Sequence, residues 1–365
     1  MTYTEIIPAD VPGENGNLCP EKDIFHLCRE NNPRRRSAVT FSCLGKLESV
    51  RCATFDRWKR SLRSLVRQAL KGVAPVPPPL VVGLTESGII PSALLHGILG
   101  ENGIDAEWIC STRRAAPGLR FTESHSHGPD HVLPLPCRQP GELWFAEDEI
   151  TTGRTLLNLC RRLCCHLAVS RVRIFALADM RPPGLRAAFD RCTAADGIRT
   201  SVHVLMPSVL SADPGRSEPV PQFSPDVPAC DGIFTSGETA PVSDWHFPDI
   251  RPALKSQTAP RCPVLPRREA GTILAVGEAV DMGLSLIQKT PGLRLHHLTL
   301  SPWEIDGNHI LNRIGVGGRY FLYNAHTLRP PIHILNDPVD EPFGRAALCE
   351  LRRKGLAAEP LRLTL

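Results

Sequence analysis

The stretch LWFAEDEITTGRT, residues 143–155, places four apolar residues, three acids and a Thr-Thr-Gly-Arg-Thr run in immediate succession. The apolar quartet, residues 143–146, is long enough for a buried strand and too short for a buried helix. Beyond the run, leucines recur at helical spacing from Leu156 to Leu167, and a helix is expected to begin at the turn that holds Gly153 and Thr155. The stretch therefore predicts a strand, an acidic edge, a small-residue loop and a helix N-terminus.

This arrangement has a chemical meaning. A helix start with small residues offers backbone N–H groups and a positive dipole end, which together hold a phosphate. Glu147 and Asp148, just before the loop, would repel a phosphate unless they face something else, such as the two vicinal hydroxyls of a ribose or a magnesium ion. A sugar phosphate satisfies both requirements at once.

Length and composition are typical of a globular protein with two domains. The chain has 365 residues, of which 42% are apolar. Its net charge of +4 gives little support to nucleic acid or an anionic membrane as the main partner. No stretch approaches the ~20 apolar residues that span a bilayer, and the N-terminus lacks the features of a signal peptide. We therefore expect a cytoplasmic protein.

The cysteines do not indicate a disulfide framework or a zinc site. Their number, 13, is odd, the chain is large, and none form paired C-x-x-C knuckles. Cys160, Cys164 and Cys165 fall within the helix expected after residue 155. We expect them to be buried, reduced thiols.

Apolar strand patterns and helical patterns alternate along the first half of the chain. LVVGL, DAEWIC and RVRIFALAD read as strands, and IIPSALLHGILG reads as a helix. The alternation predicts an α/β fold with an open, mostly parallel sheet and helices on both faces. Ligands of such sheets bind at the carboxyl ends of the strands, where GLTESG and AEDEITTGRT both lie.

The patterning divides the chain into four segments. We expect an irregular N-terminal segment over residues 1–50 and an α/β domain over residues 51–206. A proline-rich linker or irregular segment follows over residues 207–268. Residues 269–365, with TILAVGEAVDMGLSLIQ and LRLHHLTL, predict a smaller C-terminal α/β domain.

The strand, acidic pair and T-T-G-x-T run resemble the ribose-phosphate signature of the type I phosphoribosyltransferases. Further stretches resemble a bacterial branch of that superfamily found in tellurite-resistance-associated biosynthetic operons, which joins the transferase domain to a C-terminal domain named for a T-R-S-P signature. The matching pieces are NPRRR with LGK, GLTESG, STRR, FTESHSHGPDH, AEDEITTGRT, LTLSPWEI and GVGGRYFLYN. Residues 299–302 read TLSP, so the signature arginine is missing; Arg313 or Arg319 is the candidate substitute. Lys46 is followed by leucine where the branch leads us to expect histidine.

The resemblance implies a reaction and a cofactor. A nitrogen nucleophile of a base-like acceptor would displace pyrophosphate from phosphoribosyl diphosphate, with Mg²⁺, to give a nucleoside-like product. Glu147 and Asp148 would bind the ribose hydroxyls near the positive charge that develops in the transition state. The implied 5-phosphate contacts are Thr151, Thr152, Gly153, Arg154 and Thr155, and the implied pyrophosphate contacts are Thr85, Glu86, Ser87, Gly88, Arg113 and Arg114.

Some roles stay open. Glu86 is the candidate contact to magnesium or its water shell, or it caps the helix that follows. The long loop after STRR carries Glu123, His125, His127 and His131, which would serve proton transfer, the base or a metal, or would simply be surface groups. Glu278, Ser301 and Tyr320 of the C-terminal domain would line a second pocket or shape the acceptor site.

Two other functions compete with transfer. One is a non-catalytic regulator of the same fold that binds phosphoribosyl diphosphate or a nucleotide. The other is a different reaction on a phosphoribosylated compound, such as hydrolysis or ligation. STRR and FTESHSH favour catalysis. A homodimer is expected only by analogy with the superfamily.

Overall fold

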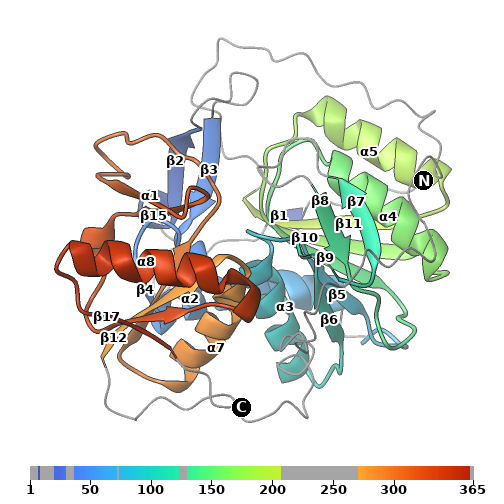
Figure 1. Cartoon of the computed structure of the whole chain (residues 1–365). Helices are drawn as coiled ribbons and strands as arrows, with labels where there is room; N and C mark the ends of the chain where they lie inside the picture. Colours follow the sequence, from blue (N-terminus) through green and yellow to red (C-terminus); the bar gives the residue numbers. More distant parts are fainter. Residues whose placement is uncertain are drawn as a thin grey trace. The chain divides into compact units, whose positions relative to one another are not determined.

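The computed structural model describes residues 7–8, 20–29, 37–71, 74–114, 116–122, 130–206 and 270–361. Contacts divide the chain into two compact units, shown in Figure 1. The first unit comprises Met1–Gly13 and Arg60–Ser243, and the second comprises Glu14–Lys59 and Asp244–Leu365. The division therefore falls inside one helix, α2 (Cys52–Leu70).

The first unit is built on a six-stranded sheet in the order β1-β11-β10-β9-β5-β6. Every neighbouring pair in it is parallel. The fold class expected from the alternating pattern, an open parallel α/β sheet, is confirmed. The strands are β1 (Ile7–Pro8), β5 (Leu80–Gly83), β6 (Glu107–Cys110), β9 (Leu143–Ile150), β10 (Arg171–Asp179) and β11 (Arg199–Met206).

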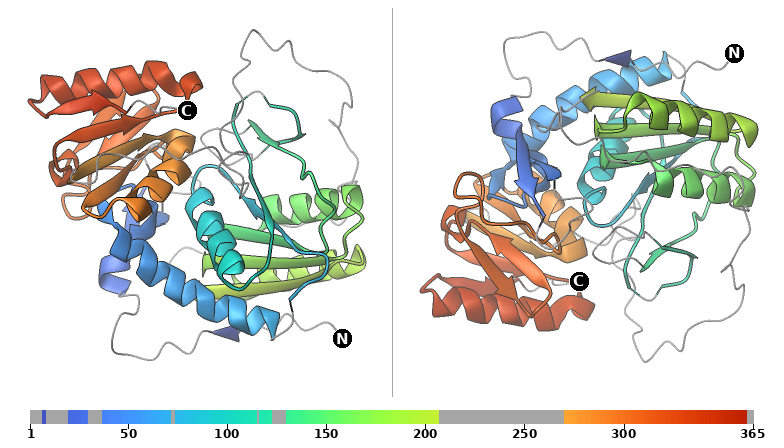
Figure 2. Two further views of the ribbon diagram at one scale, coloured as in Figure 1. Left: turned by 90° about the horizontal axis from the view of Figure 1, so that it is seen from below. Right: turned by 90° about the horizontal axis from the view of Figure 1, so that it is seen from above.

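Helices cover both faces of this sheet (Figures 1 and 2). Helix α3 (Ile89–Glu101) connects β5 to β6, whereas α4 (Arg154–His166) and α5 (Pro183–Ala195) connect β9 to β10 and β10 to β11. Because β6 and β10 lie on opposite sides of the central β5–β9 pair, right-handed crossovers place α3 on one face and α4 and α5 on the other. A short antiparallel pair, β7 (Leu119–Thr122) and β8 (Asp130–Leu133), lies between β6 and β9 in the chain.

Strand β9 is longer than the sequence pattern predicts. We expected the strand to end at residue 146, with the acids beyond it, but β9 continues through the acids to Ile150. The reason lies in its neighbour, because β10 is nine residues long and pairs with β9 up to Asp179↔Ile150. The acids are therefore held in regular strand geometry.

The second unit has its own five-stranded sheet, in the order β17-β16-β12-β13-β4. Only β4 runs antiparallel to its neighbour. Helix α7 (Val280–Lys289) connects β12 to β13, and α8 (Glu341–Arg353) connects β16 to β17. The other elements are β4 (Val50–Arg51), β12 (Gly271–Val276), η2 (Gly277–Ala279), β13 (Leu293–Leu298), β14 (Arg313–Val316), β15 (Tyr320–Tyr323), η3 (Ala325–Thr327), β16 (Ile332–Leu335), η4 (Pro338–Asp340) and β17 (Ala358–Pro360).

Part of the N-terminal segment, which we expected to be irregular, is regular in the structure. After α1 (Pro20–Asp23), strand β2 (Ile24–Cys28) pairs antiparallel with β3 (Ser37–Phe41), and η1 (Ser42–Leu44) follows. Leu27 and Ala38 of this pair pack in one apolar cluster with Trp303, Ile310 and Tyr323. Contacts with residues far along the chain stabilise these strands, and local sequence patterns do not reveal such contacts.

The described cysteines are free thiols, as expected. Cys160 and Cys164 are buried in α4, and burial raises the pKa of Cys164 to about 12. The expectation is wrong for Cys165, which is exposed because it falls on the outer face of the helix. No helix in the described parts of the chain is long and apolar enough to cross a membrane.

Glu142, immediately before β9, is a buried carboxylate that accepts hydrogen bonds from three residues. Arg173 Nε donates to its Oε2 (2.7 Å), Trp144 Nε1 donates to the same oxygen (3.0 Å), and Arg171 Nη1 donates to Oε1 (2.9 Å). Burial raises the pKa of Glu142, but the hydrogen bonds from Arg173 and Trp144 outweigh it, so the pKa lies below its usual value. The group ties the start of β9 to β10.

Glu142→Gln is expected to lower the free energy of unfolding by about 3 kcal/mol at neutral pH, because it leaves the Arg173 guanidinium without its carboxylate. A carboxyl whose pKa is lower in the folded state contributes stability above its unfolded pKa and loses that contribution as pH falls through the folded pKa. The difference between parent and variant in urea unfolding should therefore shrink as pH falls below about 4. An equal difference between parent and variant at neutral pH and below pH about 4 would contradict this account. Glu101→Gln, which breaks the exposed pair with Arg63, is the control and should cost about 0.5 kcal/mol.

Candidate active site

Two neighbouring strands of the first unit, β5 and β9, mark the point where the direction of the sheet connections reverses. The chain leaves β5 toward β6 on one side and leaves β9 toward β10 on the other. Ligands of open α/β sheets bind outside the carboxyl ends of strands at such a point. The last β5–β9 pair is Gly83↔Ala146. The structure therefore brings GLTESG and AEDEITTGRT, separated by about 60 residues, to one edge of one sheet.

The 84–88 loop, which follows β5, lies against β9. A Cβ on Gly88 would lie 2.7 Å from the backbone N and O of Leu84 and 3.0 Å from the carbonyl oxygen of Ala146. Only glycine permits this approach, because these contacts are with backbone atoms. The loop also contains a cis peptide bond between Thr85 and Glu86. Through Gly88, the 84–88 loop packs directly beside Ala146, the residue that precedes Glu147.

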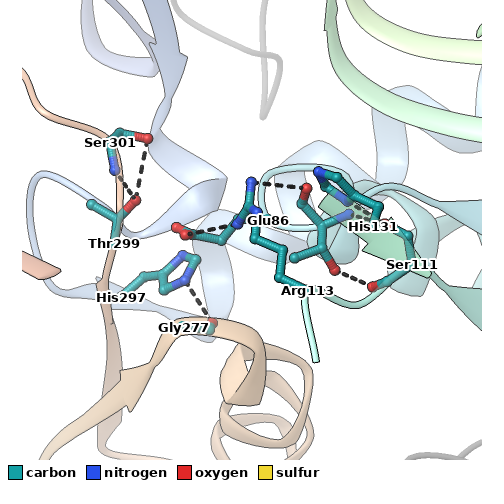
Figure 3. Close-up of polar contacts among 9 residues, drawn as sticks. Glu86, Ser111, Arg113, His131, Gly277, His297, Thr299 and Ser301 are labelled. Atoms are coloured by element: carbon teal, nitrogen blue, oxygen red, sulfur yellow. Dashed lines mark hydrogen bonds and ion pairs between the residues drawn. The ribbon is translucent and has the colours of Figure 1, made fainter. Parts of the chain in front are cut away.

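Ser111, just after β6, holds the 84–88 loop. The backbone N–H of Thr85 donates to Ser111 Oγ (2.8 Å), and Thr85 Oγ1 donates to the carbonyl oxygen of Ser111. Ser111 Oγ also contacts Nδ1 of His131 (3.3 Å), whose ring stacks on Phe121. Figure 3 shows Ser111 next to His131. Sequence reasoning missed Ser111, although its place directly after a strand at this edge was a usable signal.

Arg113 and Glu86 face each other at the same loop (Figure 3). Arg113 Nη1 lies 3.7 Å from Glu86 Oε2, and Arg113 Nη2 donates to the carbonyl oxygen of Thr85 (3.3 Å). Both side chains are largely buried. The charge of Glu86 is thus compensated by a cation. Arg114, in turn, is half-buried, and its backbone N–H donates to Thr112 Oγ1 (3.2 Å).

The acids of β9 lie where β5 has already ended. Glu147 is buried with 9% exposure, whereas Asp148 and Glu149 are half-buried. Side chains alternate along a strand, so Glu147 and Glu149 leave one face of the sheet and Asp148 leaves the other. Glu147 and Asp148 therefore leave opposite faces of β9, just beyond the last residue of β5.

The 151–155 loop has the form expected of an anion cradle. Gly153, with φ +77°, is the N-cap of α4 and makes no side-chain cap, and the first turn of the helix contains no acid. The first N–H groups of a helix have no intrahelical acceptor, and the dipole end there is positive. The Arg154 N–H contacts Thr152 Oγ1 (3.3 Å). Thr151, Thr152, Arg154 and Thr155 are half-buried, so they are accessible to a ligand.

A buried arginine that sequence reasoning missed lies against this loop. Arg181 follows β10 and is 3% exposed. Its Nε and Nη2 donate to the two carboxylate oxygens of Asp179, both at 2.9 Å. A Cβ on Gly153 would lie 3.2 Å from Arg181 Cδ and 3.4 Å from Nη1.

The remaining candidates are placed less centrally. Glu123, His125 and His127 lie outside the described residues. His131 is 2% exposed, which does not fit an exposed surface group. In the second unit Glu278 is buried in η2, and Tyr320 is buried with its ring 5.0 Å from that of Phe343.

The TLSP site lies just after β13 in the second unit. The Ser301 N–H donates to Thr299 Oγ1 (3.2 Å), and His297 Nε2 lies 2.8 Å from the carbonyl oxygen of Gly277 (Figure 3). Arg313 donates to the carbonyl oxygen of Trp303 (3.0 Å), whereas the exposed Arg319 lies over the Tyr320 ring.

Comparison with known proteins gives a family. Residues 24–208, just over half of the chain, match the family described as "Phosphoribosyl transferase". The chain belongs to this phosphoribosyltransferase family. No curated protein is significantly similar to this phosphoribosyltransferase.

Several solved phosphoribosyltransferase structures resemble this one. The adenine enzyme of Leishmania donovani is 15% identical, with a TM-score of 0.35 and coverage of 51% of this chain and 77% of that chain. The adenine enzyme of Saccharomyces cerevisiae is 12% identical, with a TM-score of 0.36 and coverage of 51% and 95%. The hypoxanthine enzyme of Trypanosoma cruzi is 15% identical, with a TM-score of 0.28 and coverage of 45% and 82%. Because these scores are low, they do not indicate which acceptor this phosphoribosyltransferase uses.

The side chains at this sheet edge can be compared with those that magnesium needs as ligands. Among the described residues, no group of three or more His, Cys, Asp or Glu side chains is arranged to hold a metal ion. Mg²⁺ usually keeps several waters and takes one or two carboxylates plus substrate phosphates, so a preformed cluster is not required. The buried carboxylate of Glu86 fits one such ligand, although Arg113 already compensates its charge.

Proposed function

We propose that this phosphoribosyltransferase uses Mg²⁺ and phosphoribosyl diphosphate to transfer a phosphoribosyl group to a nitrogen nucleophile of a base-like acceptor, with release of pyrophosphate. One observation carries the proposal. The 84–88 loop and the acid-to-helix segment of β9 and α4 meet at the reversal point of one parallel sheet, with Gly88 packed against Ala146. Family membership supports the same conclusion.

The 5-phosphate end is assigned to the 151–155 loop. The backbone N–H groups at the start of α4 would donate to the phosphate oxygens, and the helix dipole favours the negative charge. The hydroxyls of the loop would add hydrogen bonds. The proposed contacts are Thr151, Thr152, Gly153, Arg154 and Thr155.

Glu147 and Asp148 are assigned to the ribose. Their carboxylates would accept hydrogen bonds from the two vicinal hydroxyls of a ribose that lies just beyond the end of β5. Positive charge develops on the sugar as the bond to pyrophosphate breaks. Negative groups already fixed in the strand stabilise that charge without reorganisation, which is the main source of catalytic power in such sites.

The pyrophosphate end is assigned to the 84–88 loop and the two arginines that follow β6. Arg113 and Arg114 would donate to the phosphate oxygens and compensate the charge of the leaving group. Arg113 lies at the loop already, through its bond to the carbonyl oxygen of Thr85. The proposed loop contacts are Thr85, Glu86, Ser87 and Gly88.

Magnesium, when bound, would compensate the charge of the diphosphate. Glu86 is the protein carboxylate proposed to face the ion or its water shell. Arg113, whose Nη1 lies 3.7 Å from Glu86 Oε2, would donate to the pyrophosphate oxygens beside that carboxylate. The chain's own contribution is thus the carboxylate of the 84–88 loop and an arginine from the segment after β6, which lie in contact.

The acceptor side rests on the sequence resemblance. Glu123, His125, His127 and His131 are proposed to act on the acceptor. Glu278, Ser301 and Tyr320 are proposed to line a second pocket, in the C-terminal domain, residues 269–365. The product is proposed to be a nucleoside-like molecule of a tellurite-resistance or stress-type pathway, made by a cytoplasmic homodimer. The transferase domain is proposed to span residues 51–206.

The function is tested by pyrophosphate release. The protein is incubated with phosphoribosyl diphosphate and Mg²⁺, with and without each member of a panel of nucleobases and other nitrogen heterocycles. Release that requires one acceptor, with a ribosylated product seen by mass spectrometry, is the expected result. Release without any acceptor would indicate hydrolysis instead. Binding of phosphoribosyl diphosphate with no release under any condition would contradict transfer and favour the regulator.

A further inference from the structure

The Arg181 side chain packs against the 151–155 loop. Met180 N–H donates to the carbonyl oxygen of Ile150 (2.8 Å), so the turn after β10 runs beside the loop after β9. Arg181 lies over the ring of Phe189 of α5, with its guanidinium carbon 5.0 Å from the ring centroid. Gly153 rests on the same two side chains, since its Cβ position lies 3.2 Å from Arg181 Cδ and 3.3 Å from Phe189 Cδ2.

The carboxylate of Asp179 holds the Arg181 guanidinium in a fixed position. Asp179 is shared by two arginines. Arg181 holds both of its carboxylate oxygens, and Arg186 Nε lies 3.3 Å from Oδ2 while Arg186 Nη2 donates to the Asp179 carbonyl oxygen (3.0 Å). Asp179 therefore fixes the Arg181 guanidinium beside the Gly153 turn at the start of α4.

Arg181 also has a donor that is not used. Its Nη1 is buried and has no hydrogen-bond acceptor among the described residues. Buried polar groups nearly always have a partner, so an unused buried N–H requires an explanation. Nη1 is the guanidinium nitrogen closest to the Cβ position of Gly153. The unused donor therefore lies at the loop that we assign to the 5-phosphate.

We propose that Arg181 is a positioning residue for a phosphate monoester at the 151–155 loop, and this inference rests on the proposed function. Asp179 fixes the Arg181 guanidinium, and the Arg181 side chain packs against Gly153 and so fixes its turn. When the phosphate binds, Arg181 Nη1 donates to one of its oxygens. The pyrophosphate half of the substrate, assigned to the 84–88 loop, does not depend on Arg181.

The two halves of the substrate allow a selective test. Ribose 5-phosphate and pyrophosphate are titrated separately, by calorimetry, into the parent, Arg181→Met and the control Arg186→Met. Arg181→Met is expected to weaken ribose 5-phosphate binding at least about tenfold, the usual effect of a lost hydrogen bond to a charged group, and to change pyrophosphate binding by less than about twofold. The control removes a cation of the same turn without touching Gly153 and should change either affinity by less than about threefold.

A second variant separates the position of the Arg181 guanidinium from the charge of the turn. Asp179→Asn adds a positive charge to the turn but releases the guanidinium, so we expect weaker binding of ribose 5-phosphate, and it serves also if Arg181→Met does not fold. Unchanged or tighter ribose 5-phosphate binding in either folded variant would overturn the proposal, as would an equal loss of both ligands. A parent that binds neither ligand would instead contradict the proposed function itself.

Discussion

Glu147→Gln is expected to lower kcat for phosphoribosyl transfer by about 10²–10³-fold, the effect of removing one preorganised charged group from a transition state. The amide has nearly the same shape as the carboxylate and can still accept a hydrogen bond from a ribose hydroxyl, so KM should change much less than kcat. Glu147 is buried at the end of β9, beyond the last pair with β5, where its charge is little screened by water. The measurement is steady-state release of pyrophosphate with the best acceptor.

The strand offers a matched control for this variant. Glu149 lies two residues further along β9, leaves the same face and is half-buried. Glu149→Gln makes the same chemical change outside the proposed pair, and kcat should fall by no more than about twofold. Equal losses in the two variants, with both folded by circular dichroism, would contradict the assignment of Glu147 to the developing charge.

Gly88→Ala is expected to lower kcat/KM by about 10²-fold, because displacing a substrate loop by about 1 Å has an effect of this size. The added Cβ would lie 2.7 Å from the Leu84 backbone and 3.0 Å from the Ala146 carbonyl oxygen, and those backbone atoms belong to β9 and the loop itself. The loop must therefore move away from the strand. Pyrophosphate binding should weaken by a similar factor, whereas ribose 5-phosphate binding at the 151–155 loop should be retained.

Gly100, near the end of helix α3, whose N-cap is Gly88, provides the control. A Cβ at Gly100 would meet nothing within 4 Å. Gly100→Ala should therefore keep full activity and raise the free energy of unfolding by about 0.5–1 kcal/mol, as expected when glycine is replaced within a helix. If Gly88→Ala bound pyrophosphate as tightly as the parent, the 84–88 loop could not be the pyrophosphate site.

The sequence predicts the sheet of the first unit well because its signals are local. Each central strand is a short apolar run, buried on both faces, and the segment after β9 carries its own small-residue turn and leucine spacing. The same local signals mark the carboxyl ends of β5 and β9. The expected meeting of the two motifs at one edge follows from parallel pairing.

The parts that escaped prediction depend on which segments become neighbours. The length of β9 is set by β10, the β2–β3 pair is stabilised by residues near 303–323, and both missed site residues act across the sheet. Ser111 bonds Thr85, 26 residues before it, and Arg181, which follows β10, packs against Gly153 at the start of α4. The place of Ser111 directly after a strand marks it as a residue of this sheet edge, but neither residue's local sequence shows which segment it contacts.

The most direct measurement is calorimetric binding of phosphoribosyl diphosphate, with and without Mg²⁺, to the parent and to a folded Glu147→Gln, Asp148→Asn double variant. If the reversal point between β5 and β9 is the site, the parent binds in a magnesium-dependent way and the double variant binds more weakly. If the parent does not bind, or if the double variant binds as tightly as the parent, phosphoribosyl diphosphate does not occupy this site.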